Sequence, residues 1–363
     1  SDFAALFRPE VQTITVVGVL RPDAGGDLTM WHSVGPCFEV VALPPFSFWP
    51  WKMWACAKAI LRVMSLAGIV MLKMFYPFSV IAYFIARYVR CRPLTTVLVG
   101  DPEQALMLRR DLVPRKCLRR IAAAVVGWMT RMIVNGSHVA CFVSQRLNAK
   151  YWDGRSNHLV ANESWLRPSD YLPTRKLAVP PRSLLYVGRL SEPKGVLTLL
   201  DAFSVVAAEV PELRLTIVGD GPLREAVDSA SRSDPRIRYA GWVKGQSQEL
   251  YSLFRSHDVL VLPSMNEGLP LVLLEAMANR AVVCSSAVGG VKEIVEDGKS
   301  GFLYETLSAE GLIEALRRIL RSDGGYLETV VESAYEVALQ NSYAKQRGDL
   351  AQMVKDVLGQ GPS

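Results

Sequence analysis

The stretch VLVLPSMNEGLPLVLLEAMANRAVVCSS, Val259 to Ser286, contains the clearest structural pattern of the chain. The β-rich run VLVLP leads through a loop into the helical run PLVLLEAMAN, and the β-rich run AVVCSS follows. This alternation predicts a βα unit beside a parallel sheet. The same stretch carries Glu267 and Glu275 among apolar residues, where a buried carboxylate without a partner is strongly destabilising. The two acids therefore mark a candidate site.

The same rhythm continues on both sides of this stretch. Strands are predicted at SLLYVG, LRLTIVG and IRYAG, each followed by a helical run, which indicates a doubly wound parallel sheet with right-handed crossovers. The proline-rich LAVPPRS, Leu177 to Ser183, marks a linker. We expect an N-terminal domain over 1–176, a second domain over 177–342, and a C-terminal helix over 343–363 that crosses back to the first domain.

The first half contains an unusual stretch at 46–90. It is apolar and aromatic, and its only charged residues are basic: Lys52, Lys58, Arg62, Lys73, Arg87 and Arg90. Two helices broken near Pro77 are expected. Three interpretations stay open: core helices, a basic aromatic face on an anionic membrane, and a true span, which would have to tolerate Lys73.

Composition limits the partners and the compartment. The net charge of +6 suits anionic partners such as nucleotides or anionic lipid, although a solvated basic surface explains it as well. Nucleic acid is not expected, because the basic residues do not interleave with aromatic residues on one strand face. Six cysteines without CxxC spacing argue against a disulfide framework or a zinc site. With no visible signal peptide, a cytoplasmic location is expected, with peripheral membrane attachment left open.

Polar residues follow the predicted strands of the second half, and strand ends of open parallel sheets bind ligands. Arg189 and Lys194 in GRLSEPKG can neutralise a diphosphate beside a helix start, or they can be solvated bases of a surface loop. GDGPL offers glycines for close backbone approach, and GWVKG could frame a flat ring. Glu267 and Glu275, eight residues apart, would share one face if helical geometry begins near Leu269.

The motifs GRLSEPKG, GDGP, PSMNEGLPLVLLEAMA and VGGVKEIVEDGKSGFL occur in this order, and together they resemble the donor-binding domain of the retaining glycosyltransferases of family 4. The E-x7-E spacing is that family's hallmark, and the resemblance covers Ser183 to Tyr304. It implies an α/β protein with the GT-B fold: two Rossmann-like doubly wound domains facing a cleft, here with a reduced N-terminal domain.

The resemblance also implies roles for individual residues. Arg189 and Lys194 would hold the diphosphate of a UDP- or GDP-linked sugar, Glu267 the hydroxyls of the sugar, and Glu275 the ribose, with Glu267, Arg189 and Lys194 taken as the catalytic set. The remaining donor contacts would come from the base site at Val243 and from Gly188, Gly219, Gly221, Gly268, Leu269 and Leu271. No cofactor and no essential metal are implied.

The amino-terminal half resembles the family less closely. VVGVLRPDAGGDL matches the first strand and glycine loop, where Gly25 and Gly26 would approach donor phosphate or acceptor. No histidine stands at the place of the family's usual histidine loop, and among the four histidines only His32 lies near the glycine loop. The family often has Gly where this chain has Arg280, Pro where it has Val282, and Pro where it has Lys292.

The sequence thus predicts an enzyme that moves a sugar from a nucleotide-sugar to an acceptor hydroxyl with retention, a hexosyltransferase-type activity. The basic aromatic stretch 46–90 favours a lipid-linked acceptor. A different class stays open: a nucleotide-sugar-binding module, or a pseudoenzyme subunit of a glycosyltransferase complex.

Overall fold

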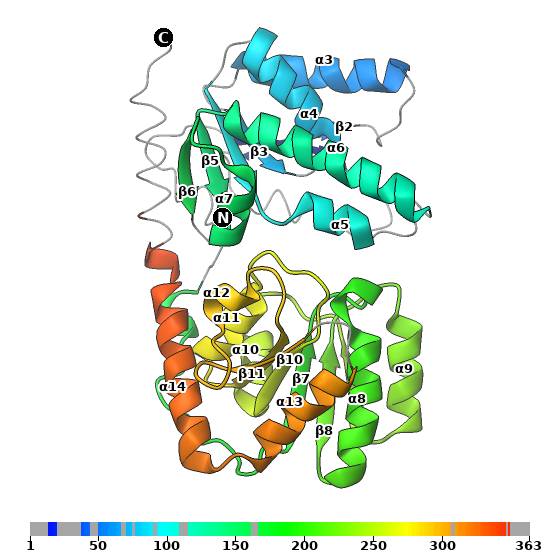
Figure 1. The fold of residues 1–363 in the computed structure, drawn as a ribbon, viewed down its shortest axis with the longest axis vertical. Helices are drawn as coiled ribbons and strands as arrows, with labels where there is room; N and C mark the ends of the chain where they lie inside the picture. The colour runs from blue at the N-terminus through cyan, green and yellow to red at the C-terminus, as the bar shows by residue number, and fades with distance from the viewer. Residues whose placement is uncertain are drawn as a thin grey trace. The chain divides into compact units, whose positions relative to one another are not determined.

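The computed structural model describes residues 14–19, 38–43, 50–66, 70–74, 77–89, 93–108, 115–160, 166–305, 309–345 and 348 (Figure 1). The chain divides into two compact units. One holds the described residues up to Val143 together with residues 147–160, and the other holds Ser144–Arg146 and residues 166–345. The sequence-based boundary at 177 assigned residues 166–176 to the first domain, whereas this division groups them with the second unit.

The second unit is built on one parallel sheet in the order β12-β11-β10-β7-β8-β9. Its strands are β7 (Ser183–Val187), β8 (Arg214–Val218), β9 (Ile237–Gly241), β10 (Val259–Leu262), β11 (Val282–Ser286) and β12 (Phe302–Tyr304). Its helices are η3 (Pro168–Asp170), η4 (Glu192–Lys194), α8 (Val196–Glu209), α9 (Arg224–Ser233), α10 (Gln248–Ser256), α11 (Leu271–Ala278), α12 (Val291–Ile294), α13 (Ala309–Arg321) and α14 (Gly324–Gln340). Strands β7, β8 and β9 follow one another toward one edge of the sheet, and β10, β11 and β12 follow one another toward the other edge. This is the order of a doubly wound sheet, as the sequence predicts.

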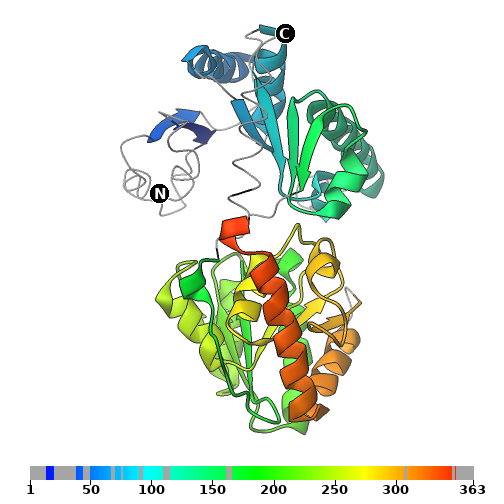
Figure 2. The ribbon, with the colours of Figure 1, turned by 90° about the vertical axis from the view of Figure 1, so that its left-hand side faces the viewer.

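Both faces of this sheet are covered, because successive residues of a strand point to opposite sides. On β10, Val259 and Val261 belong to one hydrophobic cluster with α8, α9 and α13, while Leu260 and Leu262 belong to a second cluster with α10, α11 and α12. The long helix α14 runs along the outside of the unit (Figure 2) and contributes to both clusters. The second unit therefore has a complete core of its own.

Residues 166–176 are bound tightly to the second unit. The Arg175 guanidinium donates hydrogen bonds to the carbonyl oxygens of Phe254 and His257, at 2.9 and 2.7 Å. The backbone N–H of Leu172 donates to the carbonyl oxygen of Ala278 at 2.9 Å. These contacts explain why the segment belongs with the second sheet even though it precedes the proline-rich linker.

The first unit contains a four-stranded parallel sheet in the order β3-β4-β5-β6 and a separate parallel pair of β1 and β2. The strands are β1 (Ile14–Val19), β2 (Phe38–Leu43), β3 (Val70–Met74), β4 (Leu94–Leu98), β5 (Val139–Phe142) and β6 (Asn157–Val160). The helices are α3 (Pro50–Leu66), α4 (Pro77–Phe84), η2 (Ile85–Val89), α5 (Pro102–Leu108), α6 (Lys116–Asn135) and α7 (Gln145–Tyr151).

The prediction of two helices for the stretch 46–90 is wrong in one respect. Between α3 and α4 the chain forms β3, which pairs with β4 from Val70 opposite Leu94 to Met74 opposite Leu98. Helix α3 buries Cys56, Ile60 and Met64, whereas Trp54, Lys58 and Arg62 face solvent. Among the helices that the structure describes, none combines the length and the apolar character needed to cross a bilayer.

The proposed return of the C-terminal helix falls mostly on residues outside the described ranges, as do Gly25, Gly26 and His32.

Candidate active site

The candidate site lies where the strand order reverses. Strands β7 and β10 are neighbours in the sheet, with Val259 opposite Leu184, although 71 residues separate the end of one from the start of the other. The two loops that leave their carboxyl ends are therefore brought side by side, and they carry GRLSEPKG and PSMNEGLP. Ligands of open α/β sheets bind at such a point.

Backbone hydrogen bonds join the loops at this edge. The N–H of Leu190 donates to the carbonyl oxygen of Asp220 at 2.9 Å, which ties the loop after β7 to the loop after β8. Met265 donates to Pro193 at 2.8 Å, and Gly290 donates to Gly268 at 2.8 Å. Loops from four strands thus form one connected rim, because main-chain groups satisfy one another across it.

Glycines permit this close packing, as two positions show. Gly195 has φ of 68°, and a Cβ there would lie 1.9 Å from the carbonyl oxygen of Pro263. Gly289 has φ of 52°, and a Cβ there would lie 1.8 Å from the carbonyl oxygen of Glu267. Both positions combine the left-handed backbone with a neighbouring main chain that leaves no room for a side chain, so only glycine fits.

The central contact of the site joins Lys194 to Glu267. The Nζ of Lys194 donates to Oε1 of Glu267 at 2.7 Å. The side chain of Glu267 is 10% exposed and that of Lys194 is 32% exposed, so the pair is shielded yet open to solvent on one side. Lys194 ends η4, immediately before Gly195 and α8, and its charge is therefore placed beside the positive end of a 14-residue helix.

The other acid, Glu275, has a different environment. It lies partly buried on α11, and burial, followed by the nearby charge of Asp170, raises its pKa to about 7. The charge of Glu275 contributes in turn to the raised pKa of Tyr251 on α10, where burial is the larger cause. At neutral pH this carboxyl group is poised between its two protonation states.

The condition under which the two acids would share a helical face, a helix start near Leu269, is not met. Helix α11 starts at Leu271 with Pro270 as its N-cap residue, so Glu267 lies in the loop and helical spacing does not relate the two acids. Pro270 explains the late start, because the residue before a proline is biased against helical backbone. Loop packing against Gly289, and not helix periodicity, determines where Glu267 lies.

The remaining predicted donor residues lie on the same rim or directly behind it. The N–H groups of Gly188 and Gly219 are used in bonds to Val218 and Gly241. The side chain of Arg189 is exposed and forms no ion pair with a described residue. Three side chains pack partly buried against the second hydrophobic cluster: Val243, Leu269 and Leu271. Gly221 follows Asp220, whose Oδ1 accepts its N–H at 2.9 Å.

Sequence reasoning missed two residues at this edge. The Oδ1 of Asn266 is buried and has no hydrogen-bond partner among the described residues, and Asn266 directly precedes Glu267. A polar residue beside a predicted sugar-binding acid was a usable signal for it. Asp170 gave no such signal, because it comes from the segment before the linker and reaches Glu275 only through the tertiary fold.

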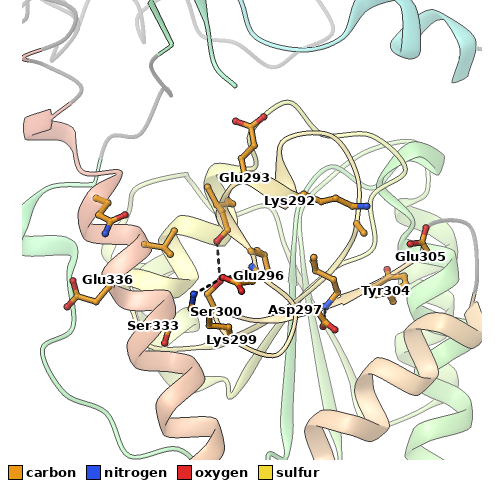
Figure 3. A pocket seen from close by; sticks show the side chains of 16 residues that line it. Lys292, Glu293, Glu296, Asp297, Lys299, Ser300, Tyr304, Glu305, Ser333 and Glu336 are labelled. Carbon is orange, nitrogen blue, oxygen red and sulfur yellow. Dashed lines mark hydrogen bonds and ion pairs between the residues drawn. The ribbon is translucent and has the colours of Figure 1, made fainter. Parts of the chain in front are cut away.

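An open pocket of about 950 Å³ lies elsewhere on the second unit, between the region of α12 and α14 (Figure 3). Two lysines and five acids line it: Lys292, Lys299, Glu293, Glu296, Asp297, Glu305 and Glu336. Neither Lys194 nor Glu267 is part of this lining. An excess of acids does not suit a diphosphate, so this pocket is not the expected donor site.

The described histidines have structural roles. The Nδ1 of His138 accepts the N–H of Leu94 at 3.0 Å, and His158 stacks on Trp152 with ring centroids 3.8 Å apart. The two nitrogens of His257 are engaged by the carbonyl oxygen of Leu253 and the hydroxyl of Thr216, both at 2.8 Å. None of these three lies on the rim that carries Lys194.

The comparisons with known proteins agree with this fold. Residues 181–322 match the family described as Glycosyl transferases group 1. Sucrose-phosphate synthase from Thermosynechococcus elongatus superposes on this chain with a TM-score of 0.72 at 16% identity. The superposition covers 96% of this chain and 99% of the synthase chain. Anabaena HepE, solved with UDP and glucose, superposes over 97% of this chain and 94% of its own, with a TM-score of 0.71 at 17% identity. The fold is therefore GT-B, as expected.

Residues 181–322 thus match a glycosyltransferase family, in agreement with the group 1 resemblance drawn from the motifs. Among curated relatives, sulfoquinovosyl transferase SQD2 of Arabidopsis thaliana is 34% identical over 140 residues, 38% of this chain and 26% of that protein. Phosphatidyl-myo-inositol mannosyltransferase of Mycolicibacterium smegmatis is 32% identical over 159 residues, 42% of this chain and 41% of that protein. The matched part spans between a quarter and a half of these relatives.

Proposed function

We propose that this chain transfers a hexosyl group from a UDP- or GDP-linked sugar to a hydroxyl group of an acceptor, with retention of anomeric configuration. The observation that carries the proposal is the Lys194–Glu267 pair at 2.7 Å on the rim where β7 and β10 meet. One member suits a diphosphate and the other suits sugar hydroxyls, so a nucleotide-sugar fits both at once.

In this proposal Arg189 and Lys194 hold the diphosphate and stabilise the charge that develops on it as the bond to the sugar breaks. Glu267 accepts hydrogen bonds from the sugar, and Glu275 accepts them from the ribose. The acceptor oxygen bonds to the anomeric carbon on the face that the diphosphate leaves, and the acceptor proton passes to a departing phosphate oxygen. Lys194 supplies the positive charge, so the proposed transfer needs no metal and should persist in excess EDTA.

The proposed acceptor is lipid-linked and is presented at an anionic membrane surface. Two observations support this: the solvent-facing side of α3 carries Trp54, Lys58 and Arg62, and one relative is named for phosphatidyl-myo-inositol. Lys58 lies 5.1 Å from the ring of Trp54, so an aromatic ring and a cation are presented together. This part of the proposal places the chain at the inner face of the membrane.

A donor screen tests the transfer. The purified chain is incubated with a panel of UDP- and GDP-sugars, and released nucleotide and calorimetric affinity are measured for each. Binding accompanied by slow donor hydrolysis, accelerated by an acceptor, is the expected result. Tight binding without hydrolysis or transfer would instead identify a nucleotide-sugar-binding module. NMR of the product then reports the anomeric configuration, and inversion would reject retention.

A further inference from the structure

Helix α6 of the first unit has an unusual outward face. Leu118, Ile121, Val125 and Trp128 are 51, 57, 49 and 62% exposed. Their spacing of three, four and three residues places them in one stripe along the helix. Scattered single apolar residues are ordinary on a protein surface, but a continuous stripe of four large ones indicates a contact with another apolar phase.

The opposite face of α6 packs inside the unit. Its buried residues are Arg119, Ala123, Gly127, Thr130, Ile133 and Val134. A Cβ on Gly127 would lie 1.7 Å from Oε1 of Glu103, which shows how closely α5 approaches this face. Figures 1 and 2 both place α6 at the outside of the first unit. The apolar stripe is thus not the core face of the helix but its solvent face.

The charges around the stripe are of one sign. Helix α6 contains no acid, and Arg115, Lys116 and Arg120 are exposed without an ion pair to any described residue. Among the described residues, the acid Glu103 approaches the packed face, and it pairs with Lys150 at 3.1 Å and with Arg131 at 3.5 Å. A helix with exposed Trp, Leu and Ile and only basic charges matches the chemistry of an anionic lipid surface.

We infer that the outward face of α6, defined here by Leu118, Ile121, Val125 and Trp128, inserts into the headgroup region of an anionic bilayer, with Arg115, Lys116 and Arg120 facing the lipid phosphates. This inference deepens the membrane part of the proposed function and rests on it. It assigns the apolar contribution to α6, whereas the basic aromatic side of α3 contributes mainly charge.

The length of the stripe fits this role. From Leu118 to Trp128 the helix advances about 15 Å, or roughly half of a bilayer core. A stripe of this length can lie in the plane of the membrane interface, but it is too short to cross the bilayer. The arrangement therefore anchors the first unit without a spanning segment.

The test is sedimentation of the full chain with vesicles of phosphatidylcholine containing phosphatidylglycerol, compared with phosphatidylcholine alone, without donor or acceptor. The double variant I121S/V125S should lower the vesicle-bound partition coefficient by about tenfold, because two apolar side chains are removed from the bilayer. Val205→Ser is the matched control, because Val205 is an exposed apolar residue of α8 in the other unit. R115Q/K116Q/R120Q should weaken binding to anionic vesicles and flatten its salt dependence.

The outcomes separate the hypotheses. If I121S/V125S binds vesicles as the unchanged chain does while K58Q/R62Q does not, the α6 inference is overturned and α3 alone is the docking element. If the unchanged chain binds no vesicles, both membrane proposals are overturned, while transfer to a water-soluble acceptor still tests the enzyme. Sedimentation velocity of the unchanged chain then tests for self-association. If the chain self-associates and I121S/V125S abolishes that association, the face of α6 binds a second copy of the chain, and the bilayer inference is overturned. An unchanged melting temperature in I121S/V125S excludes misfolding.

Discussion

At the scale of single residues, the site depends on two carboxyl groups with different environments. Glu267 is held by Lys194, whereas Glu275 lies partly buried near Asp170 and has a raised pKa. The sequence predicted both acids as a pair, but it could not predict their different environments, because burial and the approach of Asp170 are tertiary properties. From the sequence, both Lys194 and Glu267 could be placed in loops at strand ends. Their direct contact could not be predicted, because it depends on β7 and β10 being neighbours in the sheet.

Lys194→Ala should lower the rate of transfer by about 100-fold or more and weaken UDP or GDP affinity about tenfold, because a preorganised positive charge at the leaving group is lost. Initial rates and calorimetry measure the two effects. Lys176→Ala, at an exposed position of the preceding segment, is the control that should behave as the unchanged chain. An unaltered affinity and rate in Lys194→Ala would reject the diphosphate role.

Glu275 should make stability depend on pH. Its pKa is about 7 in the folded chain against an ordinary value of 4.5, so the folded state binds more protons between these values. Stability therefore falls as pH rises from 4.5 to about 7 and levels off above, by on the order of 3 kcal/mol. Urea unfolding of the unchanged chain and of Glu275→Gln across this range measures the difference. The same slope in both would show that Glu275 is not responsible.

If Glu275 binds ribose as a carboxylate, nucleotide binding lowers its pKa and releases a proton near pH 7. Calorimetry in buffers of different ionisation enthalpy detects that release. The release should disappear in Glu275→Gln, and a release of equal size in this variant would assign the proton to another group.

At the scale of elements, the second unit was predictable and the first was less so. The βα rhythm from β7 to β11 gave strands and helices correctly, because buried parallel strands and their helices have distinct patterns. Strand β3 was missed because its residues continue the apolar composition of the helices around it, and only pairing with β4 makes them a strand. The start of α11 was predicted to within one residue, because the helical run PLVLLEAMAN begins at Pro270 and the helix begins at Leu271.

The turn after α11 shows how an unusual residue is accommodated. Arg280 has φ of 57°, a backbone conformation that favours glycine. Its Nε donates to the carbonyl oxygen of Leu172 at 2.9 Å, its terminal nitrogens pair with Glu332, and its guanidinium lies 4.1 Å from the ring centroid of Tyr335. These contacts offset the cost of the left-handed backbone.

Two variants separate the side-chain contacts from the backbone strain. Arg280→Ala loses the contacts and keeps the strain, whereas Arg280→Gly loses the contacts and relieves the strain. Urea unfolding should rank the unchanged chain first, Arg280→Gly second and Arg280→Ala last, with about 1 kcal/mol between the two variants. A more stable Arg280→Ala than Arg280→Gly would contradict the role given to the backbone.

At the scale of the whole molecule, the two units have separate cores. Both hydrophobic clusters of the second unit lie within residues 166–338, and the residues assigned to the donor, apart from Gly25 and Gly26, lie in the same unit. A single chain of this length was expected to divide in this way. The sequence did not predict the attachment of residues 166–176 to the second unit, because it depends on the contacts of Arg175 and Leu172.

A fragment of residues 162–345 should therefore fold alone and bind UDP or GDP with nearly the affinity of the full chain. Cooperative thermal unfolding and a thermal shift on adding nucleotide measure folding and binding. A fragment that unfolds cooperatively but shows no shift, where the full chain shifts, would mean that the first unit supplies part of the nucleotide contact.

The rim at β7 and β10 is held by main-chain bonds, among them Leu190 to Asp220, Met265 to Pro193 and Gly290 to Gly268. Exchanging a side chain such as Arg189 or Asn266 breaks none of these bonds. Side chains of this rim can therefore change by point substitution while the scaffold stays intact. Glycines such as 195 and 289 are exceptions, because a side chain there would collide with the neighbouring main chain, and such positions should tolerate little variation.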